Sequence, residues 1–370
     1  REFFAGRNGV MQNEFLAWEK SYETWSAENP DLASELQDGV SKSVPENLLE
    51  QIPEFDAGHK DATRGSGGVV INAIAKAVPQ LVSGSADLYG STKNYIKDDT
   101  DFSATNPSGR NIWFGIREHA MGAICNGIAY DGLFRASGAT FLVFADYMRP
   151  SIRLAGLAGL PVTYIFTHDS VGVGEDGPTH SGNYDLAFLR CIPNMIIAVP
   201  ADENETRKLL TTAFMHQGPV AVRYPRGCGI NSQIDPELKP LEIGKGRLIN
   251  KRESEVIVIN FGALFGTAEK VAQELEATLI DMRFVKPLDE VLLAEHTKAK
   301  KIIVTIEDGA ISGGAGSAVN EWAQENNIKA QTIICGIPDE FIEHASREEM
   351  IEMAGLDTKS IIAKVKKYLP

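Results

Sequence analysis

Short apolar blocks alternate with longer amphipathic blocks over most of this chain. Between residues 61 and 230 the apolar blocks are bounded by turn-forming residues, as is typical of buried strands, and the blocks between them have helical spacing. The predicted strands span residues 80–86, 111–116, 134–139, 162–166, 195–199 and 220–224, and the predicted helices span 67–78, 118–130, 147–157 and 203–215. This alternation predicts an α/β fold with a doubly wound parallel sheet and helices on both faces.

Two further regions flank this one. Residues 14–25 repeat apolar residues at three- and four-residue spacing, which predicts an amphipathic helix that packs against another surface. After a polar connector at residues 232–245, a second alternating unit has predicted strands at 255–261, 277–282, 301–307 and 330–336. We therefore predict a helical linker over residues 1–60, an α/β domain over 61–230 and a second α/β domain over 231–370.

Composition narrows the functional classes. The 370 residues, of which 43% are hydrophobic, are enough for two domains with separate cores. The formal charge of -14 disfavours nucleic acid or an anionic membrane as a partner. The 4 cysteines form no Cys-x-x-Cys, so we predict neither a zinc site nor a disulfide framework, and reduced thiols favour a cytoplasmic protein. The first residue is Arg1 and not methionine, which suggests a fragment or a processed chain.

The densest group of titratable residues follows the predicted strand at 162–166. This segment, residues 167–180, contains His168, His180, three carboxylates and three glycines. Glycine permits close approach of the backbone to a ligand, and histidine exchanges protons near neutral pH. Because open α/β sheets bind ligands at the carboxyl ends of their strands, a catalytic loop is favoured here over a polar surface loop.

Glu118 stands where a predicted strand gives way to a predicted helix. An acidic residue at the start of a helix usually only compensates the helix dipole. The helix at residues 118–130, however, is apolar nearly all round, which predicts that it is buried. A carboxyl group at the mouth of a buried helix is desolvated and can share a proton, so Glu118 is a candidate for proton chemistry.

Other segments at strand ends offer weaker signals. Phe141, Phe144 and Tyr147 share one face, and they form either part of the core or an aromatic wall for a planar ring. Arginines at the ends of the first helix and the last strand of this region pair with carboxylates or grip a phosphate. The glycine-rich turn at residues 313–317 cradles an anion in one interpretation, and in the more common one it only packs tightly.

Four segments, in this order, resemble the pyrimidine-binding domain of transketolase. They are Ser-Ala-Asp-Leu at 85–88, Gly-Ile-Arg-Glu-His-Ala-Met-Gly at 115–122, Thr-Phe-Leu-x-Phe-x-x-Tyr at 140–147 and Thr-His-Asp-Ser-x-Gly-x-Gly-Glu-Asp-Gly-Pro-Thr-His at 167–180. After His180 the chain is more similar to 1-deoxyxylulose 5-phosphate synthase, at residues 185–194, 221–227, 281–289 and 313–317. The chain therefore resembles a mosaic of the two families with a seam near Ser181.

The resemblance implies thiamine diphosphate-dependent transfer of a two-carbon ketol unit between sugar phosphates. Glu118 would hydrogen-bond N1′ of the aminopyrimidine ring of the cofactor. Phe141, Phe144 and Tyr147 would line the pocket that holds this ring. Asp87 would help to close the surface between domains around the cofactor.

The resemblance also implies substrate ligands. His168, His180 and Asp176 would contact the hydroxyls and carbonyl of the sugar, with the two histidines as catalytic residues and His180 as the candidate for proton transfer. The groups that would bind the substrate phosphate are Arg64, Ser91 and Arg223.

One motif of the family is missing. The diphosphate site of these enzymes has a Gly-Asp-Gly followed by an asparagine, which together hold a divalent metal, and this sequence contains no Gly-Asp-Gly. The resemblance thus implies no metal ligand here, and it places the Mg²⁺ ligands in an N-terminal domain or a separate subunit. We expect turnover only when that part completes the enzyme, and we expect a homodimer.

Two alternatives stay open. The first is 1-deoxy-D-xylulose 5-phosphate synthase, which joins pyruvate to glyceraldehyde 3-phosphate and is favoured by the chain after His180. That enzyme typically has arginines at the positions of Phe144 and Asp169, so transketolase is the preferred interpretation. The second is a non-catalytic assembly subunit, which would have no need to keep Glu118 and both histidines.

Overall fold

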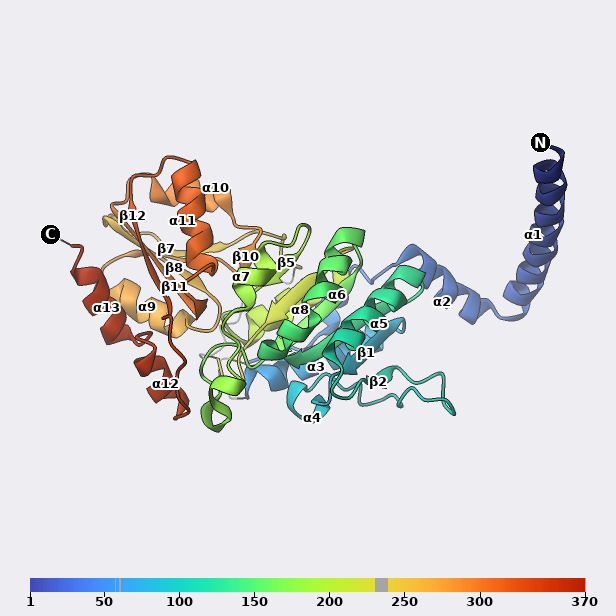
Figure 1. Ribbon diagram of the computed structural model, residues 1–370, viewed down its shortest axis with the longest axis horizontal. Coiled ribbons are helices and arrows are strands. Elements are labelled where there is room, and N and C mark those ends of the chain that lie inside the picture. Colours follow the sequence, from blue (N-terminus) through green and yellow to red (C-terminus); the bar gives the residue numbers. More distant parts are fainter. Residues whose placement is uncertain (57, 60, 230–238, 370) are drawn as a thin grey trace.

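The computed structural model describes residues 1–370 except 57, 60, 230–238 and 370. Figure 1 shows two α/β units side by side and, at the far end from the C-terminus, a long helix that extends away from them. The predicted boundary near residue 230 and the first part of the predicted connector at 232–245 lie outside the described residues.

The first sheet has seven strands in the order β10-β5-β6-β4-β3-β1-β2. Six of them are parallel where they pair, and they are β1 (Leu81–Ser85), β2 (Asn111–Trp113), β3 (Arg135–Phe141), β4 (Val162–Thr167), β5 (Ile196–Ala198) and β6 (Val220–Arg223). The predicted doubly wound parallel sheet is therefore confirmed. The seventh strand, β10 (Phe284–Lys286), is antiparallel to β5 and comes from the C-terminal part of the chain.

Helices cover both faces of this sheet. On one face, α5 (Glu118–Asp131) and α6 (Ala145–Ala158) contribute Met121, Cys125, Met148 and Ile152 to one apolar cluster. On the other face, α3 (Thr63–Ala77) and α8 (Glu203–Met215) pack in a second cluster. The remaining helices of this unit are the short α4 (Tyr89–Thr92) and α7 (Asp185–Arg190).

The second sheet has five strands in the order β12-β11-β8-β9-β7. Its strands are β7 (Arg247–Asn250), β8 (Val256–Phe261), β9 (Thr278–Asp281), β11 (Ile302–Ala310) and β12 (Gln331–Ile337), of which only β7 pairs in an antiparallel way. The helices are α9 (Phe265–Glu274), α10 (Glu290–Thr297), α11 (Ala315–Glu325), α12 (Arg347–Met353) and α13 (Thr358–Lys366). Residues of β8 and α11 join the same apolar cluster as α5 and α6, so the two units share part of their core.

The N-terminal helix α1 (Glu2–Glu28) is longer than predicted and has no buried residue. Phe15, Trp18, Tyr22 and Trp25 form a row along its surface with ring centroids 5.5 to 6.0 Å apart, and Trp18 and Tyr22 are stacked. The expectation that this helix packs against another surface is therefore not met within the described chain. After α2 (Pro30–Ser41), the segment around η1 (Leu48–Gln51) joins the core of the first unit.

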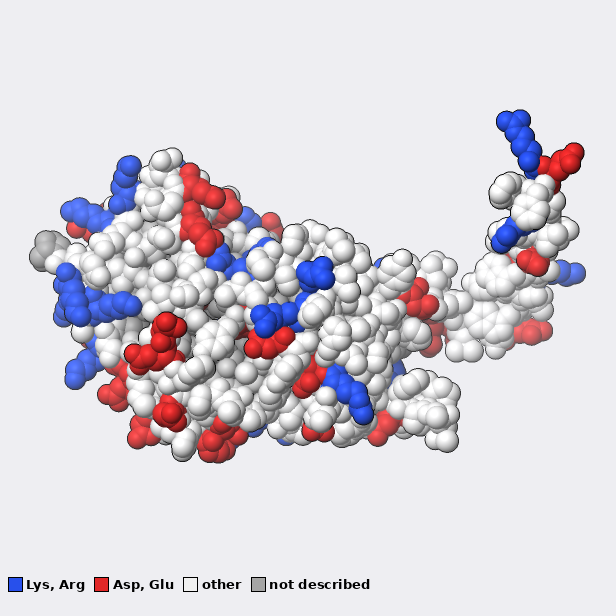
Figure 2. All heavy atoms as spheres, viewed as in Figure 1, with Lys and Arg blue, Asp and Glu red and all other residues white. Residues whose placement is uncertain are grey.

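Charges are interspersed over the surface. Figure 2 shows acidic and basic side chains intermingled on the face in view, over the middle of the molecule as well as toward its edges. Among the helices of the described residues, none combines the length and the apolarity needed to span a membrane.

Candidate active site

The predicted site residues come from loops that leave the carboxyl ends of neighbouring parallel strands. Strands β1, β3 and β4 lie side by side, so the segments that follow them, around residues 86–91, 141–147 and 167–180, meet at one edge of the sheet. We call the last of these, residues 167–180, the histidine loop. This is the edge at which open α/β sheets bind ligands.

A cavity of about 530 Å³ opens at this edge. We call it the Glu118 pocket. Its lining brings together five of the predicted site residues, and the complete set is Ala86, Asp87, Leu88, Ile116, Arg117, Glu118, His119, Phe144, Tyr147 and His180. The grouping therefore joins a carboxyl group, two aromatic rings and a histidine around one space.

A row of parallel aromatic rings forms one wall of the pocket. The rings of Phe141 and Phe144 are 6.0 Å apart with 10° between their planes, and those of Phe144 and Tyr147 are 6.2 Å apart with 20° between them. Phe141 is buried, whereas Tyr147 is 63% exposed. The inner ring therefore belongs to the core, and the two outer rings line the pocket.

Glu118 is the first residue of α5 and is half-buried. The helix itself corrects the prediction of all-round burial. Met121 and Cys125 are buried, but Ile116, just before the helix, is 80% exposed, and within it Ile124 is 46% and Tyr130 is 78% exposed. The apolar residues of α5 predict that the whole helix is buried, but one of its sides is not covered by any other part of the described chain.

His168 is buried, and its neighbours are the aromatic ring of Phe141 and the guanidinium of Arg64. Its ring stacks on Phe141 at 3.5 Å between centroids, and it is 1% exposed. Nε2 lies 3.3 Å from Nη1 of Arg64, and Nδ1 lies 2.8 Å from Oγ1 of Thr167. Arginine has no acceptor, so Nε2 accepts a hydrogen bond and the proton of the neutral ring is on Nδ1. His168 therefore orients other groups and has no proton to give from Nε2.

We expect His168 to stay neutral throughout the range in which histidine usually titrates. Burial, reinforced by the charges of Arg64 and Arg226, lowers its pKa to about 3. The folded state then binds fewer protons than the unfolded state below about pH 6.5, so this residue makes stability fall as the pH drops toward 3. NMR titration of the ring nitrogens should show no protonation above about pH 5, and Arg64→Gln should raise the pKa. Protonation of His168 near pH 6.5 in the folded chain would contradict this assignment.

His180 lies at the other end of the histidine loop and lines the pocket. Its ring meets Phe141 and Phe144 edge-on, at 6.0 and 5.6 Å between centroids. Nδ1 is 2.9 Å from Oγ1 of Thr179, so among the described residues Nε2 is the ring nitrogen that has no hydrogen-bond partner. The half-buried His180 is better placed than His168 to exchange a proton with a ligand in the pocket.

His168, Ser91 and Asp176 are neighbours of Arg64. Nη1 of Arg64 donates to the carbonyl of Ser91 at 3.3 Å as well as to His168. Burial and the charge of Arg226 lower the pKa of Arg64, and the charge of Asp176 opposes this shift. Nearby guanidinium groups favour an anion, and in the described chain the carboxylate of Asp176 lies 3.6 Å from Arg226.

Arg226 is a neighbour that the sequence analysis did not assign to the site. It binds Oε1 of Glu175 at 2.7 Å, reaches Asp176 at 3.6 Å and donates to the carbonyl of Val173. The sequence signal that could have found Arg226 was its position three residues after Arg223, at the end of a strand. Two arginines so close together are easily given the same role, although here their roles differ.

Arg223 corrects the predicted phosphate ligands. It is 2% exposed, and its guanidinium contacts Asp185 at 3.0 Å and Asp169 at 3.8 Å and donates to the backbone oxygen of Asp308 at 2.6 Å. The structure thus gives Arg223 protein partners beneath the histidine loop, and it does not bring Arg223 to the pocket.

The glycine-rich turn at residues 313–317 already holds an anion, and that anion is a side chain of the same chain. The carboxylate of Glu307 accepts from the backbone N–H groups of Ala315 and Gly316, at 2.5 and 2.7 Å. Burial, partly opposed by these two hydrogen bonds, raises the pKa of Glu307 to about 7. The turn therefore serves packing at the start of α11, and no outside phosphate is needed there.

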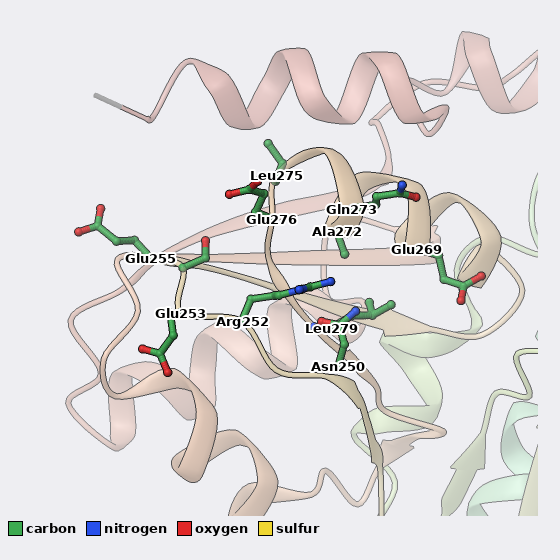
Figure 3. Close-up of a pocket in the computed structure, with 11 residues that line it drawn as sticks. Asn250, Arg252, Glu253, Glu255, Glu269, Ala272, Gln273, Leu275, Glu276 and Leu279 are labelled. Atoms are coloured by element: carbon green, nitrogen blue, oxygen red, sulfur yellow. Dashed lines mark hydrogen bonds between the residues drawn. The ribbon is translucent and has the colours of Figure 1, made fainter.

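A second hollow lies wholly within the C-terminal unit. It measures about 840 Å³ and is lined by four glutamates, Arg252 and other residues between β7 and β9, as Figure 3 shows. None of its lining residues comes from the first sheet, and none of the predicted site residues reaches it.

Comparisons with known proteins agree with this geometry. Residues 59–229 match the family model of the transketolase pyrimidine-binding domain, and residues 244–361 match that of the transketolase C-terminal domain. The chain is 46% identical over 280 residues to a transketolase of Physarum polycephalum, covering 74% of this chain and 42% of that protein. It is 48% identical over 206 residues to 1-deoxy-D-xylulose-5-phosphate synthase of Pseudomonas aeruginosa, covering 55% of this chain and 33% of that protein.

Solved structures show the same relationship. Transketolase from Leishmania mexicana superposes with a TM-score of 0.83 at 25% identity, over 96% of this chain and 52% of that chain. Transketolase from Pichia stipitis in complex with sedoheptulose-7-phosphate gives 0.81 at 26% identity, over 96% and 53%. The chain spans about a third to a half of the length of the proteins that it matches. It therefore carries, in this order, the pyrimidine-binding and C-terminal domains of the transketolase family.

Proposed function

We propose that this chain provides the pyrimidine-binding half of a thiamine diphosphate-dependent ketol transferase that acts on sugar phosphates. The observation that carries the proposal is the Glu118 pocket, where a carboxyl group, stacked aromatic rings and His180 face one cavity of about 530 Å³. The family membership of both domains supports the same chemistry. The domain limits of 61–230 and 231–370 belong to this proposal.

The residues of the pocket fit the pyrimidine end of thiamine diphosphate. Phe144 and Tyr147 offer parallel faces for a flat ring, and Glu118 offers a carboxyl group to a ring nitrogen. Asp87 lines the same cavity and is exposed, so it is available to a second domain. When bound, thiamine diphosphate supplies the carbanion chemistry of ketol transfer.

The chain's own residues then bind, orient and move protons. Glu118 fixes the ring and holds or releases a proton at its carboxyl oxygen, while His180 exchanges a proton with the sugar through Nε2. His168 accepts a hydrogen bond at Nε2, Asp176 contacts the hydroxyls of the sugar, and Arg64 with Ser91 receives the phosphate end of the substrate. We place the Mg²⁺ ligands in the diphosphate-binding part of the enzyme.

The exposed apolar side of α5 suits the surface that must cover this pocket. Ile116 and Tyr147, at the pocket, and Ile124 and Tyr130, along the helix, are exposed in the isolated chain. Large exposed apolar surfaces mark interaction sites. We propose that a diphosphate-binding domain or subunit covers this surface in a homodimeric enzyme. All four cysteines are unpaired, and we propose a cytoplasmic location on that ground.

The deciding experiment adds a diphosphate-binding domain to this chain. The chain is mixed with a diphosphate-binding domain of a transketolase, thiamine diphosphate and Mg²⁺, and ketol transfer to ribose 5-phosphate is measured. We expect turnover in the mixture and none with the chain alone. Turnover by the chain alone would reject the division of labour, and no turnover in a mixture that forms a stable complex would reject the function.

A second candidate activity has support of its own. The match to 1-deoxy-D-xylulose-5-phosphate synthase at 48% identity favours synthesis from pyruvate and glyceraldehyde 3-phosphate. Supplying these two substrates in place of the sugar phosphates separates the activities. A purely structural assembly subunit would support neither reaction, whichever diphosphate-binding domain is supplied.

We expect Tyr147→Ala to weaken cofactor binding in the completed enzyme by about tenfold. One aromatic contact contributes about 0.5–1.5 kcal/mol beyond its buried area, and that area is lost as well. Tyr147→Phe should retain most of the affinity, because the ring is kept. The measurement is the thiamine diphosphate concentration that gives half-maximal activity, with Phe341→Ala as a control at an equally exposed aromatic residue. Equal affinity in the wild type and Tyr147→Ala would place the ring elsewhere.

A further inference from the structure

The histidine loop rests on the C-terminal domain. Val171 and Val173, between the two histidines, are fully buried in the same apolar cluster as Ile306 and other core residues of that domain. A Cβ atom on Gly177 would lie only 3.1 Å from Cβ of His344. The histidine loop, which carries two predicted catalytic residues, therefore packs on the C-terminal domain. That domain contributes no residue to the lining of the Glu118 pocket.

One buried polar contact fixes the loop to this domain. Oγ of Ser170 donates to Oδ1 of Asp308, in β11, at 2.7 Å, and both residues are at most 3% exposed. Ser170 has a φ of 73°, in the left-handed region that residues other than glycine rarely adopt. The backbone oxygen of Asp308 also accepts from Arg223 at 2.6 Å. Asp308 thus holds the loop both directly and through Arg223.

Ser170 lies where the two ends of the loop meet. Its backbone N–H donates to the carbonyl of Gly182 at 3.1 Å, so the incoming and outgoing segments are side by side. His168 precedes Ser170 by two residues, and His180 precedes Gly182 by two. A shift of Ser170 relative to β11 therefore moves both histidines relative to Glu118, which is held by α5.

We propose that Asp308 is a positioning residue for ketol transfer, which holds Ser170 from the C-terminal domain and thereby sets the places of His168 and His180 at the pocket. The proposal rests on the proposed function, because it assigns Asp308 to the same reaction. Asp308 does not line the pocket. An apolar residue at position 308 would bury the loop without the desolvation cost of a carboxyl group. Asp308 differs from such a residue because it offers a hydrogen-bond acceptor in a fixed direction.

The first measurement uses the full chain and needs no turnover. Amide hydrogen exchange is compared between wild type, Asp308→Ala and Asp308→Asn. We expect exchange over residues 168–182 to rise about tenfold or more in Asp308→Ala, because the buried hydroxyl of Ser170 loses its acceptor. Asp308→Asn keeps an acceptor oxygen and should restore exchange to within about twofold. Ser170→Ala should reproduce Asp308→Ala, and the double variant should add nothing further.

The second measurement uses the enzyme completed with a diphosphate-binding domain. We expect kcat of Asp308→Ala to fall about tenfold while the cofactor concentration for half-maximal activity changes less than about twofold, because Glu118 and Tyr147 are not on the loop. Glu321→Ala is the matched control. It breaks the contact of 2.5 Å between Glu321 and Arg190, which also joins the two domains, and should alter neither measurement.

The outcomes separate the two proposals. Unchanged loop exchange in Asp308→Ala, or an equal rise across the whole C-terminal domain, would overturn the positioning role. A rise confined to the loop with unchanged kcat would overturn it as well. If wild type shows no turnover in the completed enzyme, the proposed function fails, while the exchange data still decide whether Asp308 holds the loop. If Asp308→Ala does not fold, Ser170→Ala provides the same comparison.

Discussion

Glu118→Gln is expected to lower kcat/KM for ketol transfer by about 10³-fold in the completed enzyme, within the range of about 10² to 10⁴ that acid–base groups contribute. Glutamine keeps the size of the side chain and its hydrogen-bonding capacity, but it cannot hold and release a proton. Glu118 is half-buried at the start of α5 and faces the pocket with Tyr147 and His180. The change therefore removes proton exchange while leaving the walls of the pocket in place.

Steady-state turnover and thermal unfolding should be measured on the same preparations. Asp131→Asn, at the last residue of the same helix, is the control, because it makes the same chemical change on an exposed residue away from the pocket. If Glu118 serves only to compensate the helix dipole, Glu118→Gln will cost about 0.3–1 kcal/mol of stability and leave turnover within a few fold. That result would reject the catalytic interpretation of the pocket.

The sequence predicts the core of the fold well because buried parallel strands are almost wholly apolar and their helices are amphipathic. All six predicted strands of the first sheet are present, although the one expected at 111–116 ends at Trp113. The strand β10, Phe284–Lys286, was missed. It is short, and it pairs with β5 across the boundary between the two units, so its conformation depends on contacts that no local pattern encodes.

Burial was the weaker part of the prediction. The apolar pattern of α1 and α5 indicates surfaces that avoid water, but it does not say which chain covers them. Within the described residues, α1 has no buried residue, and Ile124 and Tyr130 of α5 are exposed. The same holds in part for α6, where Met148 and Ile152 are buried but Leu154 and Leu157 are exposed.

The site was predictable where its residues follow strand ends. Glu118, Phe144 and His180 are far apart in the sequence, yet the order of parallel strands places them around one pocket. Asp308 could not be found in this way, because it belongs to the second sheet and acts from beneath the loop. The buried ion pair of Arg223 could not be predicted for a related reason, since nothing in the sequence shows that Asp185 lies against its guanidinium.

Arg223→Ala is expected to reduce the free energy of unfolding by about 3–5 kcal/mol, as is typical when one partner of a buried ion pair is removed. The guanidinium is 2% exposed and lies against the carboxyl groups of Asp169 and Asp185. Burial already raises the pKa of Asp169 to about 7 and that of Asp185 to about 6, while the charge of Arg223 lowers both. Without Arg223, either a charge is buried without a partner or the carboxyl groups take up protons on folding.

Arg226→Ala is the matched comparison, since it changes the next arginine of the same segment. Arg226 is 29% exposed and pairs with Glu175, which is 76% exposed, so its loss should cost less than about 1 kcal/mol. Urea unfolding of both variants measures the difference. If Arg223 were instead a phosphate ligand, as the family resemblance implies, Arg223→Ala would unfold like wild type and only raise KM for the sugar phosphate in the completed enzyme. A loss of stability that is large for Arg223→Ala and small for Arg226→Ala assigns Arg223 to the support of the histidine loop and leaves the phosphate to Arg64 and its neighbours.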